Sequence, residues 1–146
     1  MIAVLDPIAD VSTPGQPFTG ALNSRLQARP QGRGDLGQRM VRALNQAPQG
    51  PAILIGADIQ GLTSAALGRA LKANISANIV FGPATDGGFW LLGTRAGLSV
   101  RQFKTVGWSE PTTLAQSVNA FPTAKRVHFV DILSDVDSME DLAKFS

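Results

Sequence analysis

Buried strands and amphipathic helices follow one another along the chain. Short, continuously apolar runs are typical of strands covered on both faces, whereas apolar residues at helical spacing indicate helices. The apolar runs predict strands over residues 2–5, 51–57, 77–81, 89–94 and 126–130. The helical spacings predict helices over residues 35–47, 63–72, 111–120 and 137–145. This order indicates an α/β fold with helices on the faces of a sheet, whose ligands bind beyond the carboxyl ends of the strands.

Several of these helices carry their own start signals. Thr63 is an N-cap for the helix that follows it, and Asp35 stands between a glycine-rich loop and the next apolar stripe. Asp137 and Glu140 form a D-x-x-E capping box before the last predicted helix. Helix capping is therefore a sufficient structural reason for Asp35 and Asp137.

Length and composition indicate one folded domain over residues 1–146. Hydrophobic residues make up 44% of the chain and charged residues 16%, which excludes a disordered protein. The apolar runs are broken well short of the ~20 residues that a membrane span needs, so no membrane association is expected. No basic segment precedes the first apolar run, which is unlike a secretory signal, and we expect a cytoplasmic protein.

The absence of cysteine and the uneven charge limit the chemistry further. With no cysteine there is no disulfide, thiolate metal site or thiol nucleophile, so a metal ion must be held by oxygen. The net charge of +2 is too small to favour a nucleic-acid partner. Arginines nevertheless cluster between residues 25 and 42, and acidic residues between 131 and 141. One region could hold phosphates and the other a cation.

Five sequence blocks occur in an order that resembles a known family. The blocks are QGRGDLGQRM from Gln31, ILIGADIQGL from Ile53, FGPATDGGFWLLG from Phe81, WSEPTTLAQ from Trp108 and DVDSMEDL from Asp135. Together they resemble a bacterial family of glycosyltransferase-like proteins of largely unassigned activity, of the arsenosugar-biosynthesis type. That family is similar to the guanylyltransferases of molybdopterin and deazaflavin-cofactor synthesis, including 2-phospho-lactate guanylyltransferases. The resemblance implies a GT-A-like, three-layer sandwich with a mostly parallel sheet.

Asp58 follows a predicted buried strand and is the first candidate metal ligand. A carboxylate at this position can bridge Mg²⁺ or Mn²⁺ to the phosphates of a nucleotide, and Mg²⁺ usually takes one or two protein carboxylates. The resemblance favours this role over a carboxylate that caps the turn before Leu62. Relatives carry a small residue and proline next, where this chain has Ile59 and Gln60.

The loop before helix 35–47 is a candidate contact for a nucleotide or another substrate. Glycines around a helix start let free amides face an anion, and arginine can neutralise phosphate. A plain loop with an N-cap and solvated arginines is the alternative interpretation. The candidate residues are Gln31, Gly32, Asp35 and Arg39.

Two further segments carry candidate acceptor contacts, and one carries a second metal ligand. Gly87 and Gly88 permit a tight turn that presents Asp86, which could bind a sugar or acceptor hydroxyl or could simply be solvated. Trp108 and Ser109 begin a loop in which the indole could stack on a ligand or be buried against the sheet. The resemblance also implies Asp137 as a second cation ligand, with the capping box as the alternative.

The remaining reactive side chains give no support for a hydrolase. His128 is the one histidine and lies in the apolar strand 126–130, where a structural role is expected. No serine is paired with a credible histidine, so a nucleophilic triad is not expected. Phe89 and Trp90 are expected in the core.

The sequence differs from the family at its start. Relatives begin with a further strand and a basic loop that grips the nucleotide, and here the first strand resembles the second strand of the family. We therefore expect an N-terminally shortened sheet, which closes up or is completed by a second subunit in a homo-oligomer. The leading hypothesis is a nucleotidyltransferase- or glycosyltransferase-like protein of reduced or lost activity. The alternative is a non-catalytic remnant that binds a nucleotide or a protein.

Overall fold

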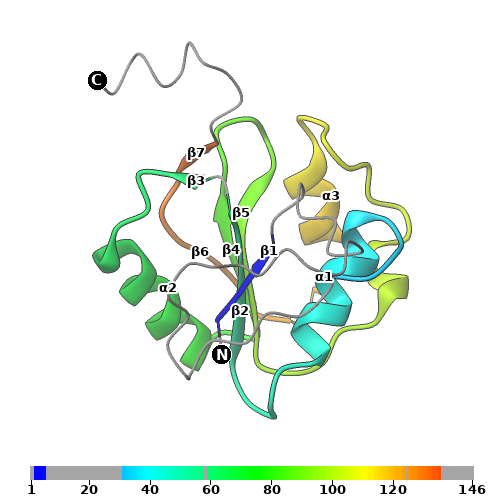
Figure 1. The fold of residues 1–146 in the computed structure, drawn as a ribbon, viewed down its shortest axis with the longest axis horizontal. Coiled ribbons are helices and arrows are strands. Elements are labelled where there is room, and N and C mark those ends of the chain that lie inside the picture. The colour runs from blue at the N-terminus through cyan, green and yellow to red at the C-terminus, as the bar shows by residue number, and fades with distance from the viewer. Residues whose placement is uncertain (1, 6–30, 58, 124, 136–146) are drawn as a thin grey trace, which may run out of the picture.

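A mixed five-stranded sheet with helices on both faces forms the centre of the molecule (Figure 1). The computed structural model describes residues 2–5, 31–57, 59–123 and 125–135. The strands of this sheet are β1 (Ile2–Leu5), β2 (Ala52–Gly56), β4 (Ile79–Pro83), β5 (Phe89–Thr94) and β6 (Val127–Phe129). The helices are α1 (Leu36–Asn45), α2 (Ser64–Ser76), the 3₁₀ helix η1 (Val100–Phe103) and α3 (Thr113–Asn119). A separate two-stranded sheet pairs β3 (Ile59–Gln60) with β7 (Ser134–Asp135).

The strand order of the large sheet is β1-β2-β5-β4-β6. β1 runs parallel to β2 and β6 runs parallel to β4, whereas β5 is antiparallel to both of its neighbours. β1, β2, β4 and β6 therefore share one direction, which confirms the mostly parallel α/β sheet expected from the sequence. β1 pairs directly with β2, from Ile2 opposite Ile53 to Leu5 opposite Gly56. β1 and β2 thus pair within the chain, and completion of the sheet by a second subunit stays a prediction.

Two apolar clusters cover the two faces of the sheet. In β2, Ala52 and Leu54 pack on the side of α1, while Ile53 and Ile55 pack on the side of α2. All four side chains are at most 8% exposed. Figure 1 shows the same division, with α2 on one side of the sheet and α1 and α3 on the other. Burial on both faces explains why this stretch of the sequence lacks polar alternation.

A β-bulge in β5 places a tryptophan over its neighbouring strand. Gly82 pairs with Leu91 and Pro83 pairs with Phe89, so Trp90 is the additional residue on β5. Trp90 and Leu91 consequently belong to the same apolar cluster, and Trp90 is only 1% exposed. Its ring covers Gly82, where a methyl group would lie 2.5 Å from Cε2 of the indole. Both Phe89 and Trp90 are expected in the core: Trp90 is fully buried, and Phe89 is half-buried.

The observed elements differ from the predicted ones mainly at their ends. α2 begins after the predicted cap Thr63 but continues past residue 72 to Ser76. The next strand starts later than predicted, at Ile79, because Ala77 is the C-cap of α2. The sequence did not predict η1 or the β3–β7 pair. The predicted helix 137–145 lies outside the described residues.

Substitution of Gly82 by alanine tests the packing of Trp90. The added methyl group would overlap the indole, and overpacking of this kind costs roughly 1–3 kcal/mol. Gly68 is a matched control because it lies on the exposed face of α2 with no atom near the site of the new methyl group. Gly68→Ala should stabilise the protein by about 0.5–1 kcal/mol. Urea unfolding of both variants measures the difference, and equal effects would contradict this packing.

Candidate functional site

The candidate site lies where β4 ends and β5 begins. β2 and β4 point their carboxyl ends to this edge of the sheet, and the antiparallel β5 starts from it. Three segments with predicted functional residues meet here: the start of α1, the turn at residues 84–88, and the loop at residues 107–112. Each of them joins or precedes a regular element, so the sheet and helices fix their positions.

The turn between β4 and β5 is a tight hairpin with an aspartate at its tip. The amide of Ala84 donates to the carbonyl of Gly88 at 3.0 Å, and that of Gly87 to Ala84 at 3.2 Å. Asp86 is exposed, and its Oδ1 accepts the amide of Gly88 at 2.8 Å. Gly87 has a φ of +92°, as its place in the turn predicted. Asp86 is therefore held at the edge of the sheet by its own turn.

The loop at residues 107–112 packs closely against this turn. The amide of Leu114 donates to the carbonyl of Gly87 at 2.9 Å. A methyl group at Gly87 would lie 2.0 Å from the carbonyl oxygen of Pro111, so only glycine fits between the two backbones. A hydrogen bond from α3 also holds the loop, because Thr113 Oγ1 donates to the carbonyl of Gly107 at 2.6 Å. The turn and the loop thus form one unit.

Trp108 joins the loop to the start of α1. Its ring lies 6.5 Å from that of Phe89 and 6.0 Å from that of Phe103. A methyl group at Gly37 would lie 2.7 Å from Cζ2 of Trp108, so the indole rests against the first turn of the helix. The half-buried indole packs against the apolar core, as expected if Trp108 has a structural role. Ser109 is exposed and has a φ of +61°, a strained conformation of the kind found at functional sites.

The start of α1 is capped from within the chain. Asp35 Oδ1 accepts the amide of Gln38 at 2.8 Å, and Gln38 Oε1 accepts the amide of Asp35 at 3.1 Å. This capping box explains Asp35 without a ligand. The contact of Asp35 with a substrate stays a prediction.

Two arginines of α1 hold the loop that precedes the helix. Arg39 Nη1 donates to Gln31 Oε1 at 3.0 Å, and Arg42 donates to the carbonyls of Gln31 and Arg33. Gly32 has a φ of +78°, which lets the loop turn over the guanidinium of Arg42. The guanidinium groups thus lie beside the loop and interact with it, and a role in binding phosphate stays a prediction.

The structure therefore brings three of the predicted segments together. Gly37 contacts Trp108, and Gly87 contacts Pro111 three residues further along. Through these contacts the candidates lie on one continuous part of the molecule. They are Gln31, Gly32, Asp35 and Arg39 before and in α1, Asp86, Gly87 and Gly88 in the turn, and Trp108 and Ser109 in the loop.

The two predicted cation ligands, Asp58 and Asp137, lie outside the described residues. The β3–β7 pair comes next to both of them in the sequence, since Ile59 pairs with Asp135. In the described ranges, no group of three or more His, Cys, Asp or Glu residues could hold a metal ion. Cation binding by Asp58 and Asp137 stays a prediction.

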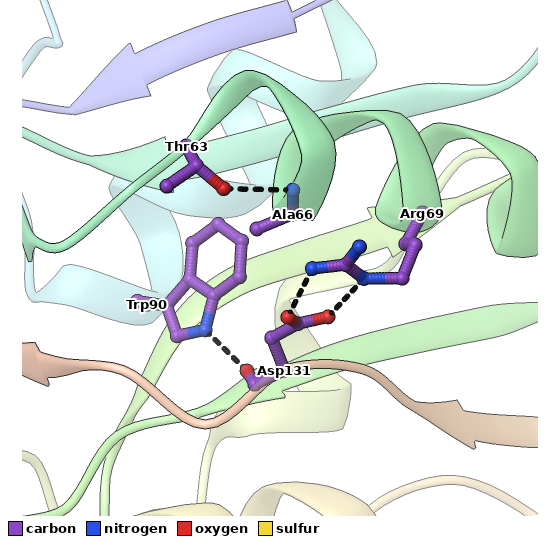
Figure 2. A network of polar contacts seen from close by, with 5 residues as sticks. All are labelled: Thr63, Ala66, Arg69, Trp90 and Asp131. Carbon is purple, nitrogen blue, oxygen red and sulfur yellow. Dashed lines mark hydrogen bonds and ion pairs between the residues drawn. The ribbon is translucent and has the colours of Figure 1, made fainter.

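A polar network that the sequence did not predict joins α2, β5 and the segment after β6 (Figure 2). Arg69 binds the carboxylate of Asp131 through two hydrogen bonds, of 2.9 and 2.6 Å. The backbone carbonyl of Asp131 accepts the indole N–H of Trp90 at 2.8 Å. Thr63, also drawn in Figure 2, caps α2 by accepting the amide of Ala66 at 3.1 Å. No local pattern marks a pair so far apart in the chain.

The ion pair between Arg69 and Asp131 shifts the pKa of both side chains. The hydrogen bonds from Arg69, and then its charge, lower the pKa of Asp131 below its usual range. The hydrogen bonds to Asp131 raise the pKa of Arg69. Both groups are partly exposed, at 58% for the Arg69 side chain and 29% for that of Asp131. Solvent screens such a pair, so its contribution to stability is small.

His128, expected to be structural, lies on the edge strand β6 and is exposed. Within the part of the chain that the structure describes, no helix is long and apolar enough to cross a membrane.

The stability that Asp131 contributes should depend on pH. Because its pKa is lowered in the folded protein, the contribution is present above the usual pKa of an aspartate and is lost as the pH falls through the lowered value. Asp131→Asn should therefore melt slightly below the wild type at pH 7, and the two melting temperatures should converge as the pH falls below the lowered pKa of Asp131. Thermal unfolding followed by circular dichroism measures both. A constant difference over this range would contradict the ion pair.

Gly87→Ala should disrupt the junction between the turn and the loop. The substitution combines a positive φ with an overlap with the Pro111 carbonyl, and we expect a loss of about 3 kcal/mol or more. Gly61 is the matched control, because its φ is +74° but open space surrounds it. Gly61→Ala should lose only about 1–2 kcal/mol. Chemical unfolding of both variants separates the backbone strain from the overlap.

Comparisons with known proteins agree with the observed fold. A protein from Desulfovibrio desulfuricans G20, provisionally named a nucleotide-diphospho-sugar transferase, has a similar crystal structure, with a TM-score of 0.69 and 27% sequence identity. The match covers 80% of this chain and 52% of that one, so the present chain spans about half the length of that protein. It confirms the expected likeness to the nucleotide-diphospho-sugar transferase fold.

The remaining comparisons concern the family. No curated protein matches the chain. A family model described as "Uncharacterized protein conserved in bacteria (DUF2064)" matches residues 4–110. None of these comparisons supports the finer resemblance to arsenosugar-biosynthesis proteins or guanylyltransferases. Since the match spans most of the sequence, the chain belongs to this family of uncharacterised bacterial proteins.

Proposed function

We propose that the protein binds a nucleotide or a nucleotide sugar together with a divalent cation, as a nucleotidyl- or glycosyltransferase-like protein. The observation that carries the proposal is the contact of Gly37 with Trp108 and of Gly87 with Pro111. These contacts gather the predicted substrate-binding segments at the carboxyl edge of the sheet, where ligands of α/β folds bind. The similar structure named as a nucleotide-diphospho-sugar transferase supports the same ligand class.

The start of α1 is the proposed contact for phosphate. The amino end of a helix carries partial positive charge and free amides. The N-cap carboxylate of Asp35 already accepts the amide of Gln38, and the first turn of α1 has no other acidic residue. The guanidinium groups of Arg39 and Arg42, which lie beside the preceding loop, are the positive charges that support an anionic ligand here.

The proposed cation ligands are Asp58 and Asp137. In the β3–β7 ladder, Ile59, the neighbour of Asp58 in the chain, pairs with Asp135, two residues before Asp137. This pairing supports a cation shared by the two segments. Mg²⁺ or Mn²⁺ needs only one or two protein carboxylates when phosphate and water complete its coordination. The cation would supply charge neutralisation for the diphosphate.

Asp86 and Ser109 are the proposed contacts of the acceptor. Both are exposed, and the packing of Gly87 on Pro111 holds their segments together. A carboxylate at the tip of the turn can accept a hydrogen bond from a hydroxyl group and so orient it for transfer. Trp108 supports this surface through its packing on Gly37.

Binding without transfer is the second candidate function. Arg39 and Arg42 donate hydrogen bonds to their own loop, which leaves fewer of their N–H groups free to bind a developing negative charge on phosphate. A non-catalytic module that binds a nucleotide or a protein partner would need no such stabilisation.

A thermal-shift panel of GTP, CTP, UTP and UDP-sugars, each with Mn²⁺, tests the proposal. A ligand at about 100 times its Kd stabilises the folded state by about 2.7 kcal/mol. Wild type should show this shift with one class of nucleotide, and Asp58→Ala should lose its dependence on Mn²⁺. Asp86→Ala is the matched control, because it removes an acceptor contact and should keep the shift.

Two results would contradict the proposal. The absence of any shift with the wild type contradicts nucleotide binding, and an equal shift for Asp58→Ala contradicts the cation site. Mass spectrometry of the incubated nucleotide then separates the two candidate functions. Release of a nucleoside diphosphate from a nucleotide sugar, or of pyrophosphate from a nucleoside triphosphate, indicates transfer or hydrolysis, whereas unchanged nucleotide indicates binding alone.

A further inference from the structure

The outer edge of β6 is open in the part of the chain that the structure describes. β6 stands last in the order of the large sheet, and β4 is the one strand that pairs with it there. A groove of about 660 Å³ separates α2 from the segment that runs from His128 to Ile132, so the helix leaves this edge uncovered. Open edge strands offer backbone hydrogen bonds to another strand. β6 is therefore a place where the sheet can extend.

The ladder with β4 determines which backbone groups of β6 face the open side. The carbonyl of Arg126 accepts an amide of β4 at 3.1 Å, and the amide of Val130 donates to a carbonyl of β4 at 2.9 Å. In a parallel ladder, alternate residues of a strand bond to the same neighbour. Arg126, His128 and Val130 therefore bond towards β4. Val127 and Phe129, which alternate with them, present their N–H and C=O groups to the open side.

These open groups match a second copy of the same strand. A two-fold axis that passes through the edge at His128 pairs β6 with its own copy in an antiparallel manner. Val127 of one copy then lies opposite Phe129 of the other, and the two residues can exchange both N–H···O=C hydrogen bonds. The symmetry repeats this pair on the other side of the axis, so every open backbone group of β6 gains a partner.

The side chains of β6 suit the same register. Phe129 is 49% exposed and stacks on Phe81 of the apolar cluster on the α1 side, with ring centroids 6.5 Å apart. Val127 is half-buried against the same cluster. In the antiparallel pair, Phe129 of one copy packs beside Val127 of the other, which sets an aromatic ring against a β-branched side chain. The contact removes an exposed ring from water.

The charges that flank β6 are complementary in this register. Lys125 and Arg126 precede the strand and are exposed, and Asp131 follows it. Antiparallel pairing about His128 places Lys125 of one copy opposite Asp131 of the other, and the same pair recurs across the axis. The carboxylate of Asp131 binds Arg69 of its own chain, yet 29% of its side chain stays exposed, so a lysine can approach it.

We propose that β6 pairs antiparallel with β6 of a second copy about a two-fold axis at His128, which joins the two large sheets into one. The basic end of each strand then lies against the acidic end of the other. Because the paired strands run in opposite directions, the carboxyl edges of the two sheets point away from each other, and both candidate substrate sites stay open. This interface is independent of the proposed ligand.

Trapping of a symmetric disulfide tests the register, because the natural chain has no cysteine. His128 is exposed and faces its own copy on the axis, where opposite residues lie close enough for a disulfide. Mild oxidation of His128→Cys should give a covalent dimer in most of the protein. Ile132→Cys is the matched control, because Ile132 is 67% exposed beside the same edge but would lie roughly 25 Å from its copy. The control should form roughly tenfold less covalent dimer.

Sedimentation velocity measures the dimer without a new cysteine. The wild type should change from monomer to dimer between about 1 and 500 µM, as expected for a small interface. Phe129→Glu should weaken the dimer roughly tenfold, because it places a carboxylate in the apolar contact, and circular dichroism verifies that this variant folds.

Two charge reversals on the exposed flank of β6 leave the core untouched. Lys125→Glu should weaken the dimer roughly fivefold, because it sets a carboxylate opposite Asp131, and the effect should fade at high salt. Arg126→Glu is the matched control, because this register places Arg126 opposite the uncharged Val130, and the dimer should weaken less.

Several results would overturn the proposal. A wild type that stays monomeric up to about 500 µM shows that another segment or partner occupies the edge. Equal trapping of His128→Cys and Ile132→Cys, or none in either, excludes this register. Equal dissociation constants for Lys125→Glu and Arg126→Glu exclude the cross-strand charge pair.

Discussion

Burial of the sheet on both faces is the constraint on which the rest of the structure depends. The side chains of β2, and Val80, Phe81, Leu91 and Leu92 of the neighbouring strands, are removed from water almost completely. Each buried side chain of this size stabilises the fold by roughly 1.5–3 kcal/mol. Burying a polar group without a hydrogen bond is costly, and Asn74, the one polar side chain of α2 that is buried, donates through Nδ2 to the carbonyl of Ala52. The Oδ1 of Asn74 has no hydrogen-bond partner among the described residues.

The reversed direction of β5 determines which end carries the candidate chemistry. Because β4 and β5 form a hairpin, the turn that presents Asp86 returns to the same edge at which β2 and β4 end. The loop beginning at Trp108 then packs on this turn and on α1 through two glycines, Gly37 and Gly87. Close backbone contact, more than side-chain polarity, assembles the site. This arrangement explains why several short, dissimilar sequence blocks can serve one surface.

The buried strands and capped helices could be predicted because their causes are local. Continuous apolar residues located β2 and β5, and the N-caps Asp35 and Thr63 located the starts of α1 and α2. The contacts that join distant segments could not be predicted. Ile59 pairs with Asp135 in a two-residue ladder that is too short to leave a pattern, and nothing near Arg69 marks Asp131 as its partner. The candidate residues were recognisable by type, but the packing of Trp108 on Gly37 was not.

The pairing of the strands also implies an order in which the sheet assembles. β4 and β5 are joined by the short turn at residues 84–88, whereas β1 and β2 pair across the whole of residues 6–51. The entropy lost on closing a loop rises with its length, and distant pairings form slowly. The β4–β5 hairpin can therefore nucleate folding, β2 adds to it, and the edge strands β1 and β6, which pair across residues 6–51 and 84–126, join the sheet last. Because each of them is held by one neighbour alone in the described part of the chain, β1 and β6 are also the first strands that thermal fluctuation would detach.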